Sequence, residues 1–167
     1  MENAKPETPL ANSWHIHPNG GGLVNNSATV HHTAHVGVGA TVWYEATVGP
    51  RVTVGERATV GEYATVRKGA IIEAVAFIGD GATVGDGAHV GKYATVRAGA
   101  YVGLEATVGD DAYVGDGAYV GARVTVGEDA IVGKGAIVRE GANVVDSAAV
   151  GEYAIFGPHT TVGDGTK

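Results

Sequence analysis

Acidic side chains recur at a fixed interval in the second half of the chain. Four of them stand 18 residues apart, at Asp110, Glu128, Asp146 and Asp164. If the chain folds with an 18-residue period, their carboxylates form a column, and Ca²⁺ takes about six to eight such oxygen ligands. The alternative is a solvated corner, where the carboxylates spread apart and salt screens their repulsion. We expect the solvated corner, with a calcium site as the sharper hypothesis.

Histidine is the other residue type that can do chemistry here. An imidazole can act as a general base, and three converging imidazoles can hold zinc. Of seven histidines, His89 alone lies in the central part of the chain, among threonines. His15 and His17 fall on one side of an extended segment, which suits adventitious zinc or nickel at most. The chain has no cysteine, which excludes disulfides, thiolate metal sites and a cysteine nucleophile. No catalytic residue and no cofactor can be assigned from these residues.

The elements that must position these side chains follow from a six-residue repeat. Residues 22–165 contain 24 such units without insertion or deletion, and fixed periods of this kind indicate a solenoid. Numbering each unit 1 to 6 from Gly22, position 1 is alanine in 20 units and position 3 is valine in 21. Positions 1 and 3 share one side of an extended strand, and position 2 points the other way. Position 4 is glycine in 16 units, which predicts a corner that needs a positive φ or a close backbone approach.

The repeat resembles that of the bacterial hexapeptide-repeat superfamily, whose motif is aliphatic, Gly, two variable residues, small, variable. Residues 60–65, Val-Gly-Glu-Tyr-Ala-Thr, fit that motif, as do most later units. The resemblance implies an all-β fold: a single left-handed parallel β-helix with triangular coils of 18 residues, about eight coils and no inserted loops. It identifies the chain as a member of unassigned role or a consensus-like design. The predicted parts are an N-terminal tail or cap at 1–21, the β-helix at 22–165 and a C-terminal end at 166–167.

Position 2 side chains should form outward ladders with members 18 residues apart. Two of these ladders become apolar toward the C-terminus and flank one corner, and exposed apolar patches mark interaction sites. The residues expected to form a self-association interface are Tyr101, Tyr113, Tyr119, Ile131, Ile137 and Ile155. Members of the superfamily form trimers, so the resemblance implies a homotrimer.

A threonine ladder occupies the first half of one of these faces, at Thr29, Thr47, Thr65 and Thr83. Flat ranks of threonine can order water, which suggests ice binding or another surface-binding role. Ordinary strand preference and cross-strand threonine pairing explain the same pattern. Ice-binding relatives with this fold carry two threonine ranks on a face, whereas this sequence supplies one.

Composition limits the kinds of partner that this chain is expected to bind. The formal net charge is −7 and the basic residues are scattered, which disfavours nucleic acid. No apolar stretch is long enough to span a bilayer, and the N-terminus lacks the apolar run of a secretory signal. We expect no membrane partner, and a cytoplasmic or virion-associated location fits. No small-molecule substrate can be identified.

The sequence therefore favours a non-catalytic, rigid structural or interaction module that self-associates. The alternative is an enzyme of the superfamily, an acyltransferase or a zinc carbonic anhydrase, with His89 or another histidine in a cleft between subunits. Superfamily acyltransferases usually extrude a loop over the substrate, and the gapless repeat of this chain leaves no room for one.

Overall fold

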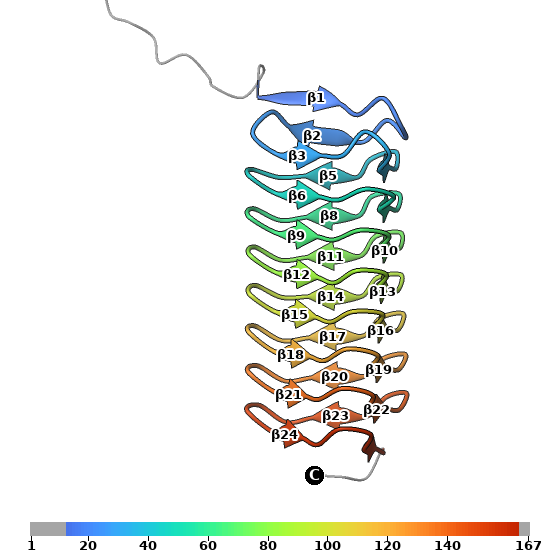
Figure 1. Cartoon of the computed structure of the whole chain (residues 1–167), viewed down its shortest axis with the longest axis vertical. Helices are drawn as coiled ribbons and strands as arrows, with labels where there is room; N and C mark the ends of the chain where they lie inside the picture. Colours follow the sequence, from blue (N-terminus) through green and yellow to red (C-terminus); the bar gives the residue numbers. More distant parts are fainter. Residues whose placement is uncertain (1–12, 164–167) are drawn as a thin grey trace, which may run out of the picture.

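The chain forms one straight solenoid of short strands. The computed structural model describes residues 13–163, and within that range it contains 25 strands and no helix. The coils stack along the long axis of the molecule, and the chain advances steadily from one end to the other (Figure 1). Within the described range no helix is long and apolar enough to cross a membrane. The predicted all-β parallel solenoid is confirmed, and it is consistent with the left-handed β-helix that the resemblance implies.

Three sheets make up the walls, and we name them A, B and C. Sheet A has nine strands: β1 (Trp14–Ile16), β2 (Leu23–Asn25), β5 (Thr41–Val42), β8 (Thr59–Val60), β11 (Phe77–Ile78), β14 (Thr95–Val96), β17 (Tyr113–Val114), β20 (Ile131–Val132) and β23 (Ala149–Val150). Sheet B has eight: β3 (Thr29–Val30), β6 (Thr47–Val48), β9 (Thr65–Val66), β12 (Thr83–Val84), β15 (Tyr101–Val102), β18 (Tyr119–Val120), β21 (Ile137–Val138) and β24 (Ile155–Phe156). Sheet C also has eight: β4 (His35–Val36), β7 (Thr53–Val54), β10 (Ile71–Ile72), β13 (His89–Val90), β16 (Thr107–Val108), β19 (Thr125–Val126), β22 (Asn143–Val144) and β25 (Thr161–Val162).

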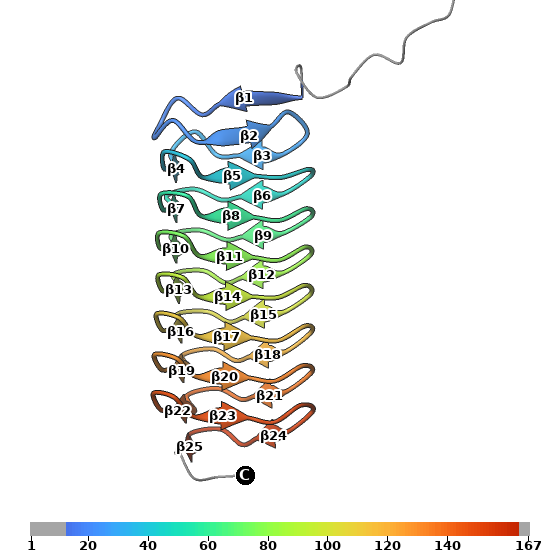
Figure 2. The same ribbon diagram turned by 180° about the vertical axis from the view of Figure 1, so that it is seen from behind.

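The register between neighbouring coils is 18 residues throughout. Thr83 pairs with Tyr101, for example, and Val84 with Val102, in parallel. Each coil therefore passes from sheet A to sheet B to sheet C, and the same view from behind shows the corners in regular columns (Figure 2). Equivalent side chains stack directly above one another, which is what brings residues far apart in sequence into contact.

The core is a column of alanine and valine. Val84 and Val102 are fully buried, as are the position 1 and position 3 residues of nearly every coil. Narrow coils leave little volume for the position 1 residue, which explains why alanine dominates there. Only near the ends is the core partly open, and Phe156 is half-buried where it packs against the last coils. Among the described residues, no buried side-chain nitrogen or oxygen lacks a hydrogen-bond partner.

The two features expected of the corner glycines, close backbone approach and a positive φ, occur at different positions of the repeat. Position 4 glycines have ordinary φ angles but lie against the next coil: a Cβ at Gly103 would be 2.6 Å from the backbone of Gly121. Positive φ angles occur instead at position 6, where glycine alternates with larger residues such as Val75, at φ 63°. Close approach therefore favours glycine at most position 4 sites, while position 6 carries the left-handed backbone.

The first coil is covered by an antiparallel strand. Strand β1 pairs with β2, with Trp14 opposite Asn25 and Ile16 opposite Leu23. Trp14 packs edge-on against Trp43, with ring centroids 5.2 Å apart. Ile16 is 68% exposed, so its side chain does not cover the first coil. The end of the solenoid is closed by backbone pairing and one tryptophan, because pairing satisfies the edge strand without an apolar plug.

Candidate functional site

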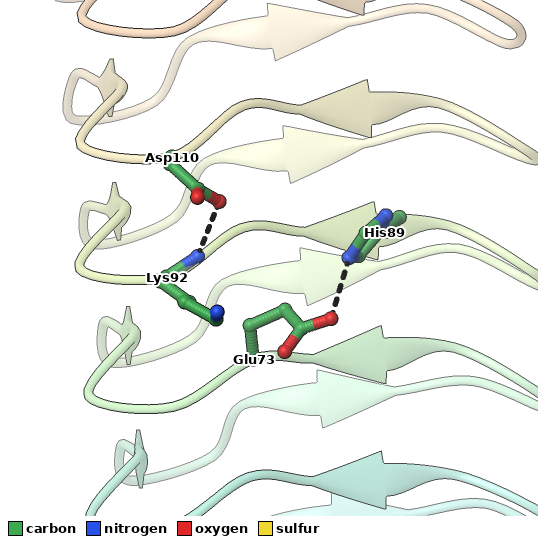
Figure 3. Close-up of polar contacts among 4 residues, drawn as sticks. All are labelled: Glu73, His89, Lys92 and Asp110. Atoms are coloured by element: carbon green, nitrogen blue, oxygen red, sulfur yellow. Dashed lines mark hydrogen bonds and ion pairs between the residues drawn. The ribbon is translucent and has the colours of Figure 1, made fainter.

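The strongest chemical arrangement on the surface is a histidine paired with a glutamate. His89 Nε2 lies 3.1 Å from Glu73 Oε1, and the two side chains are 44% and 36% exposed. Glu73 follows β10 at the corner between sheets C and A, and His89 is the outward residue of β13, the next strand of sheet C. The close-up shows the two side chains pointing toward each other from adjacent coils (Figure 3). We call them the Glu73–His89 pair.

The repeat itself explains why these residues meet. Glu73 stands at position 4, where most units have glycine, so a side chain projects from a corner that is usually bare. His89 stands at position 2 of the following coil, facing outward between Ile71 and Thr107. The side-chain oxygen of Glu73 reaches the ring from the coil before, 3.1 Å from Nε2. A single departure from glycine therefore builds the pair.

The pair has the geometry of an oriented imidazole. When Nε2–H donates to the carboxylate, Nδ1 is the acceptor nitrogen of the neutral ring. Within residues 13–163, Nδ1 makes no hydrogen bond, so it is available to a ligand. Lys92 lies nearby, and its side chain extends toward the coil of Glu73 (Figure 3). Such an imidazole can accept a proton from a hydroxyl or an amine.

The acidic column has a structural task. Asp110 Oδ1 accepts a hydrogen bond from the backbone N–H of Lys92, at 2.8 Å, and Asp146 Oδ1 accepts one from Glu128 N–H, at 3.1 Å. Each aspartate thus caps a free N–H of the preceding coil. No group of three or more histidine, aspartate or glutamate residues within 13–163 is placed to hold a metal ion. Asp164 lies outside the described residues, so calcium binding at this column stays a prediction.

The described histidines near the N-terminal end contact polar groups or stack on one another, and none of these contacts joins two ring nitrogens. His15 Nδ1 lies 2.8 Å from Asn26 Oδ1, and His35 Nδ1 lies 3.4 Å from Asn19 Oδ1. His31 stacks on His32, with centroids 4.3 Å apart. The zinc arrangement of the carbonic anhydrases is not assembled among the described residues of this chain.

The apolar ladders stack as the repeat predicts. Tyr101 and Tyr119 are parallel, with ring centroids 5.1 Å apart and an interplanar angle of 6°. Tyr113 pairs with Ile131 on sheet A, and Ile137 pairs with Ile155 on sheet B. The two ladders flank the corner between sheets A and B, and their role as an interface stays a prediction. On sheet B the register also stacks the four threonines in one rank: Thr29, Thr47, Thr65 and Thr83.

Sequence reasoning singled out His89 but missed its partner. Glu73 is 16 residues earlier, so no short motif joins the two. The signal lay in the repeat: position 4 is glycine in 16 of 24 units, and the exceptions put a side chain on a corner. Glu73 and Trp43 are two of these exceptions. Glu73 contacts His89, and Trp43 lines a hollow on the surface of the solenoid.

Comparisons with known proteins agree with this fold. The family model described as bacterial transferase hexapeptide (six repeats) matches residues 105–140. No curated protein matches the sequence. The fold is similar to that of the UDP-N-acetylglucosamine acyltransferase of Arabidopsis, with a TM-score of 0.73 and 14% identity over 86% of this chain and 62% of that one.

Two further solved structures are similar. The UDP-N-acetylglucosamine acyltransferase of Francisella novicida has a TM-score of 0.66 and 17% identity over 84% of this chain and 62% of that one. The UDP-N-acetylglucosamine O-acyltransferase of Moraxella catarrhalis RH4 has a TM-score of 0.58 and 14% identity over 81% and 66%. At these identities the likeness establishes the fold. The chain spans 62% of the length of the first two proteins.

Proposed function

The chain belongs to the bacterial hexapeptide-repeat superfamily, and on that premise we propose that it is an acyltransferase with His89 as its general base. The observation that carries the proposal is the 3.1 Å contact between His89 Nε2 and Glu73 Oε1. The three similar solved structures reported for Arabidopsis, Francisella novicida and Moraxella catarrhalis are acyltransferases, which is why acyl transfer is the reaction we assign. The donor is an acyl thioester, and the acceptor is a hydroxyl or an amine.

The reaction needs one group to move a proton. Glu73 holds the imidazole with Nε2–H toward its carboxylate, so Nδ1 accepts the proton of the acceptor as its oxygen or nitrogen attacks the thioester carbonyl. A tetrahedral intermediate forms, the carbon–sulfur bond then breaks, and the imidazolium returns the proton to the leaving thiolate. Glu73 stabilises the imidazolium that exists between these steps.

A neighbouring subunit would complete the site. The Glu73–His89 pair is partly exposed on a single chain, and a flat face excludes little water. Glu73 stands at the corner where sheet C turns into sheet A, and sheet A carries part of the apolar ladder. A second copy packed against sheet A would therefore border the pair. Trimerisation and catalysis are thus linked in this proposal.

A thiol-release assay tests the proposal. The purified protein is incubated with acyl-CoA thioesters of several chain lengths and a panel of amine and sugar acceptors, and free thiol is measured with a chromogenic thiol reagent. The chain has no cysteine, so the reagent reports released thiol alone. We expect acceptor-dependent release, and replacement of His89 by alanine should slow it about 10²–10⁴-fold.

The controls separate a base from a surface residue. Glu73→Gln should lower kcat and alter its pH dependence, because the amide no longer stabilises an imidazolium. His35→Ala, on the same sheet but outside the pair, should leave the rate unchanged. A rate that survives in His89→Ala, or no acceptor-dependent release from the unaltered protein, would refute the proposal.

A second candidate is the non-catalytic, self-associating module. The observation that favours it is the unbroken 18-residue register over the described coils, which makes each outer face a flat ladder. This candidate requires the trimer but not His89. Normal assembly of a His89→Ala variant together with no thiol release from the unaltered protein would favour it.

A further inference from the structure

A hollow lies on the corner between sheets A and B, a different corner from that of Glu73. Its volume is about 260 Å³, and it is open to solvent. It spans three coils near the N-terminal end. The residues that line it are Trp43, Thr59, Gly61, Glu62, Phe77 and Asp80. We call it the Trp43–Phe77 hollow.

Two aromatic rings flank a floor of small residues. Trp43 occupies position 4, so its ring projects from a corner, and it is 41% exposed. Trp14 packs edge-on against this ring at 5.2 Å and helps to fix its orientation. Phe77, on β11, is 38% exposed and pairs with Thr59 in the coil before it. Thr59 and Gly61 therefore leave room between the two rings.

Two carboxylates border the hollow without a cationic partner. Among the ion pairs of residues 13–163, none includes Glu62 or Asp80. Asp80 uses Oδ1 to accept the backbone N–H of Glu62, at 3.0 Å, which leaves Oδ2 free. The surroundings are electronegative: a hydrogen bond to Glu45 raises the pKa of Tyr44, and the charges of Glu45 and Glu62 add to that shift.

The chain itself shows what such a carboxylate binds. At the same corner further along, Arg97 at position 4 pairs with Asp116 at position 5 of the next coil, with Nε 3.4 Å from Oδ1. The equivalent of Arg97 for Asp80 is Gly61, which has no side chain. Within residues 13–163 the chain thus supplies no cation to Asp80, which lines the hollow together with the two aromatic rings.

We propose that the Trp43–Phe77 hollow binds a small organic ammonium ion, with its N-alkyl groups against Trp43 and Phe77 and its charge beside Glu62 and Asp80. Aromatic faces attract cations within about 6 Å of the ring centroid, and quaternary ammonium ions are recognised by such aromatic sites. Carboxylates supply the long-range attraction, and apolar walls favour alkylated ammonium over a hydrated metal ion. The site is distinct from the Glu73–His89 pair, because it lies on the corner between sheets A and B, whereas Glu73 lies on the corner between sheets C and A.

Tryptophan fluorescence provides the test. The chain has two tryptophans, so a Trp14→Phe background leaves Trp43 as the only source of tryptophan emission. Choline is titrated at constant ionic strength, with its neutral isostere 3,3-dimethylbutan-1-ol and methyl β-glucoside as comparison ligands. We expect saturable change with choline at a Kd on the order of 1 mM or below, and at least about tenfold weaker binding of the alcohol.

Charge variants decide between cation binding and plain apolar contact. Glu62→Gln removes a charge from an exposed side chain and should weaken choline binding about fivefold or more. Asp80→Asn tests the second carboxylate, with folding checked by circular dichroism because Asp80 also caps Glu62. Asp116→Asn, at the same corner but outside the hollow, should have no effect. Equal binding of choline and its neutral isostere, tighter binding of the glucoside, or unaltered binding in Glu62→Gln would overturn the proposal.

Discussion

Val75 shows the strain that the corners of this solenoid accept. Its φ is 63°, a left-handed conformation that costs a non-glycine residue about 1–2 kcal/mol and is least suited to a β-branched one. Its side chain is 40% exposed, so little burial offsets that cost. Equivalent corners, such as that of Gly81, place glycine at the same position with φ 66°.

Replacing Val75 by glycine should therefore stabilise the protein. We expect a gain of about 1 kcal/mol in the free energy of unfolding, or roughly 2–4 °C in Tm for a chain of this size. The reverse change, Gly81→Val, is the matched control, because nothing lies within 4 Å of a Cβ there and only the backbone is strained. It should lower Tm by a similar amount. A Val75→Gly variant that melts below the unaltered protein would contradict this account.

The repeat predicts some individual residues of the candidate site but not the contacts between them. His89 could be named as a candidate because its imidazole is alone among threonines. Its partner could not, because the contact depends on the direction that the Glu73 side chain takes from its corner and not on spacing in the chain. The corner glycines were expected to need a positive φ or close approach, and only coordinates separate the two: close approach at position 4, positive φ at position 6.

At the scale of the strand, two residues per strand are enough to hold each coil together, because the inward side chains are completely buried. Position 1 and position 3 side chains fill the interior, and each buried valine contributes about 1.5–3 kcal/mol. Their periodicity alone predicted the coils and the register, and Val84 and Val102 are buried as that prediction requires. Strand β1 was not predictable in this way, because its antiparallel pairing with β2 follows no repeat.

An unpaired charge in the alanine and valine core should unfold the protein. Val84→Asp places a carboxylate where no water or cation reaches it, which costs several kcal/mol. Ala94→Phe should be as damaging, since position 1 has no volume to spare. Thr83→Asp, one residue away on the outward face, is the control and should change the free energy of unfolding by about 1 kcal/mol or less. A thermal melt of Val84→Asp within a few degrees of the unaltered protein would show that the core argument is wrong.

At the scale of the whole molecule, two neighbouring faces carry unpartnered apolar side chains. Tyr119 and Ile131 are 44% and 47% exposed and stand on sheets B and A, on either side of one corner. A wedge with two apolar faces packs naturally around a threefold axis, because each face A meets a face B of the next copy. Exposure of this kind marks an association surface.

Sedimentation tests directly whether the chain forms a trimer. The unaltered protein should have the mass of three chains at tens of micromolar, and Tyr119→Glu combined with Ile131→Glu should have the mass of one. Thr107→Glu on sheet C is the control and should remain trimeric. A monomer at that concentration in the unaltered protein would contradict the trimer and, with it, the shared site proposed for acyl transfer.

The constant register has an evolutionary consequence. Because each 18-residue turn contacts only the turns before and after it, one whole turn can be duplicated or deleted without disturbing the rest. Molecular length thus changes in steps of about 4.8 Å, the spacing of paired strands. A turn duplicated after His89 would lengthen the molecule by one such step while leaving both the Glu73–His89 pair and the Trp43–Phe77 hollow intact.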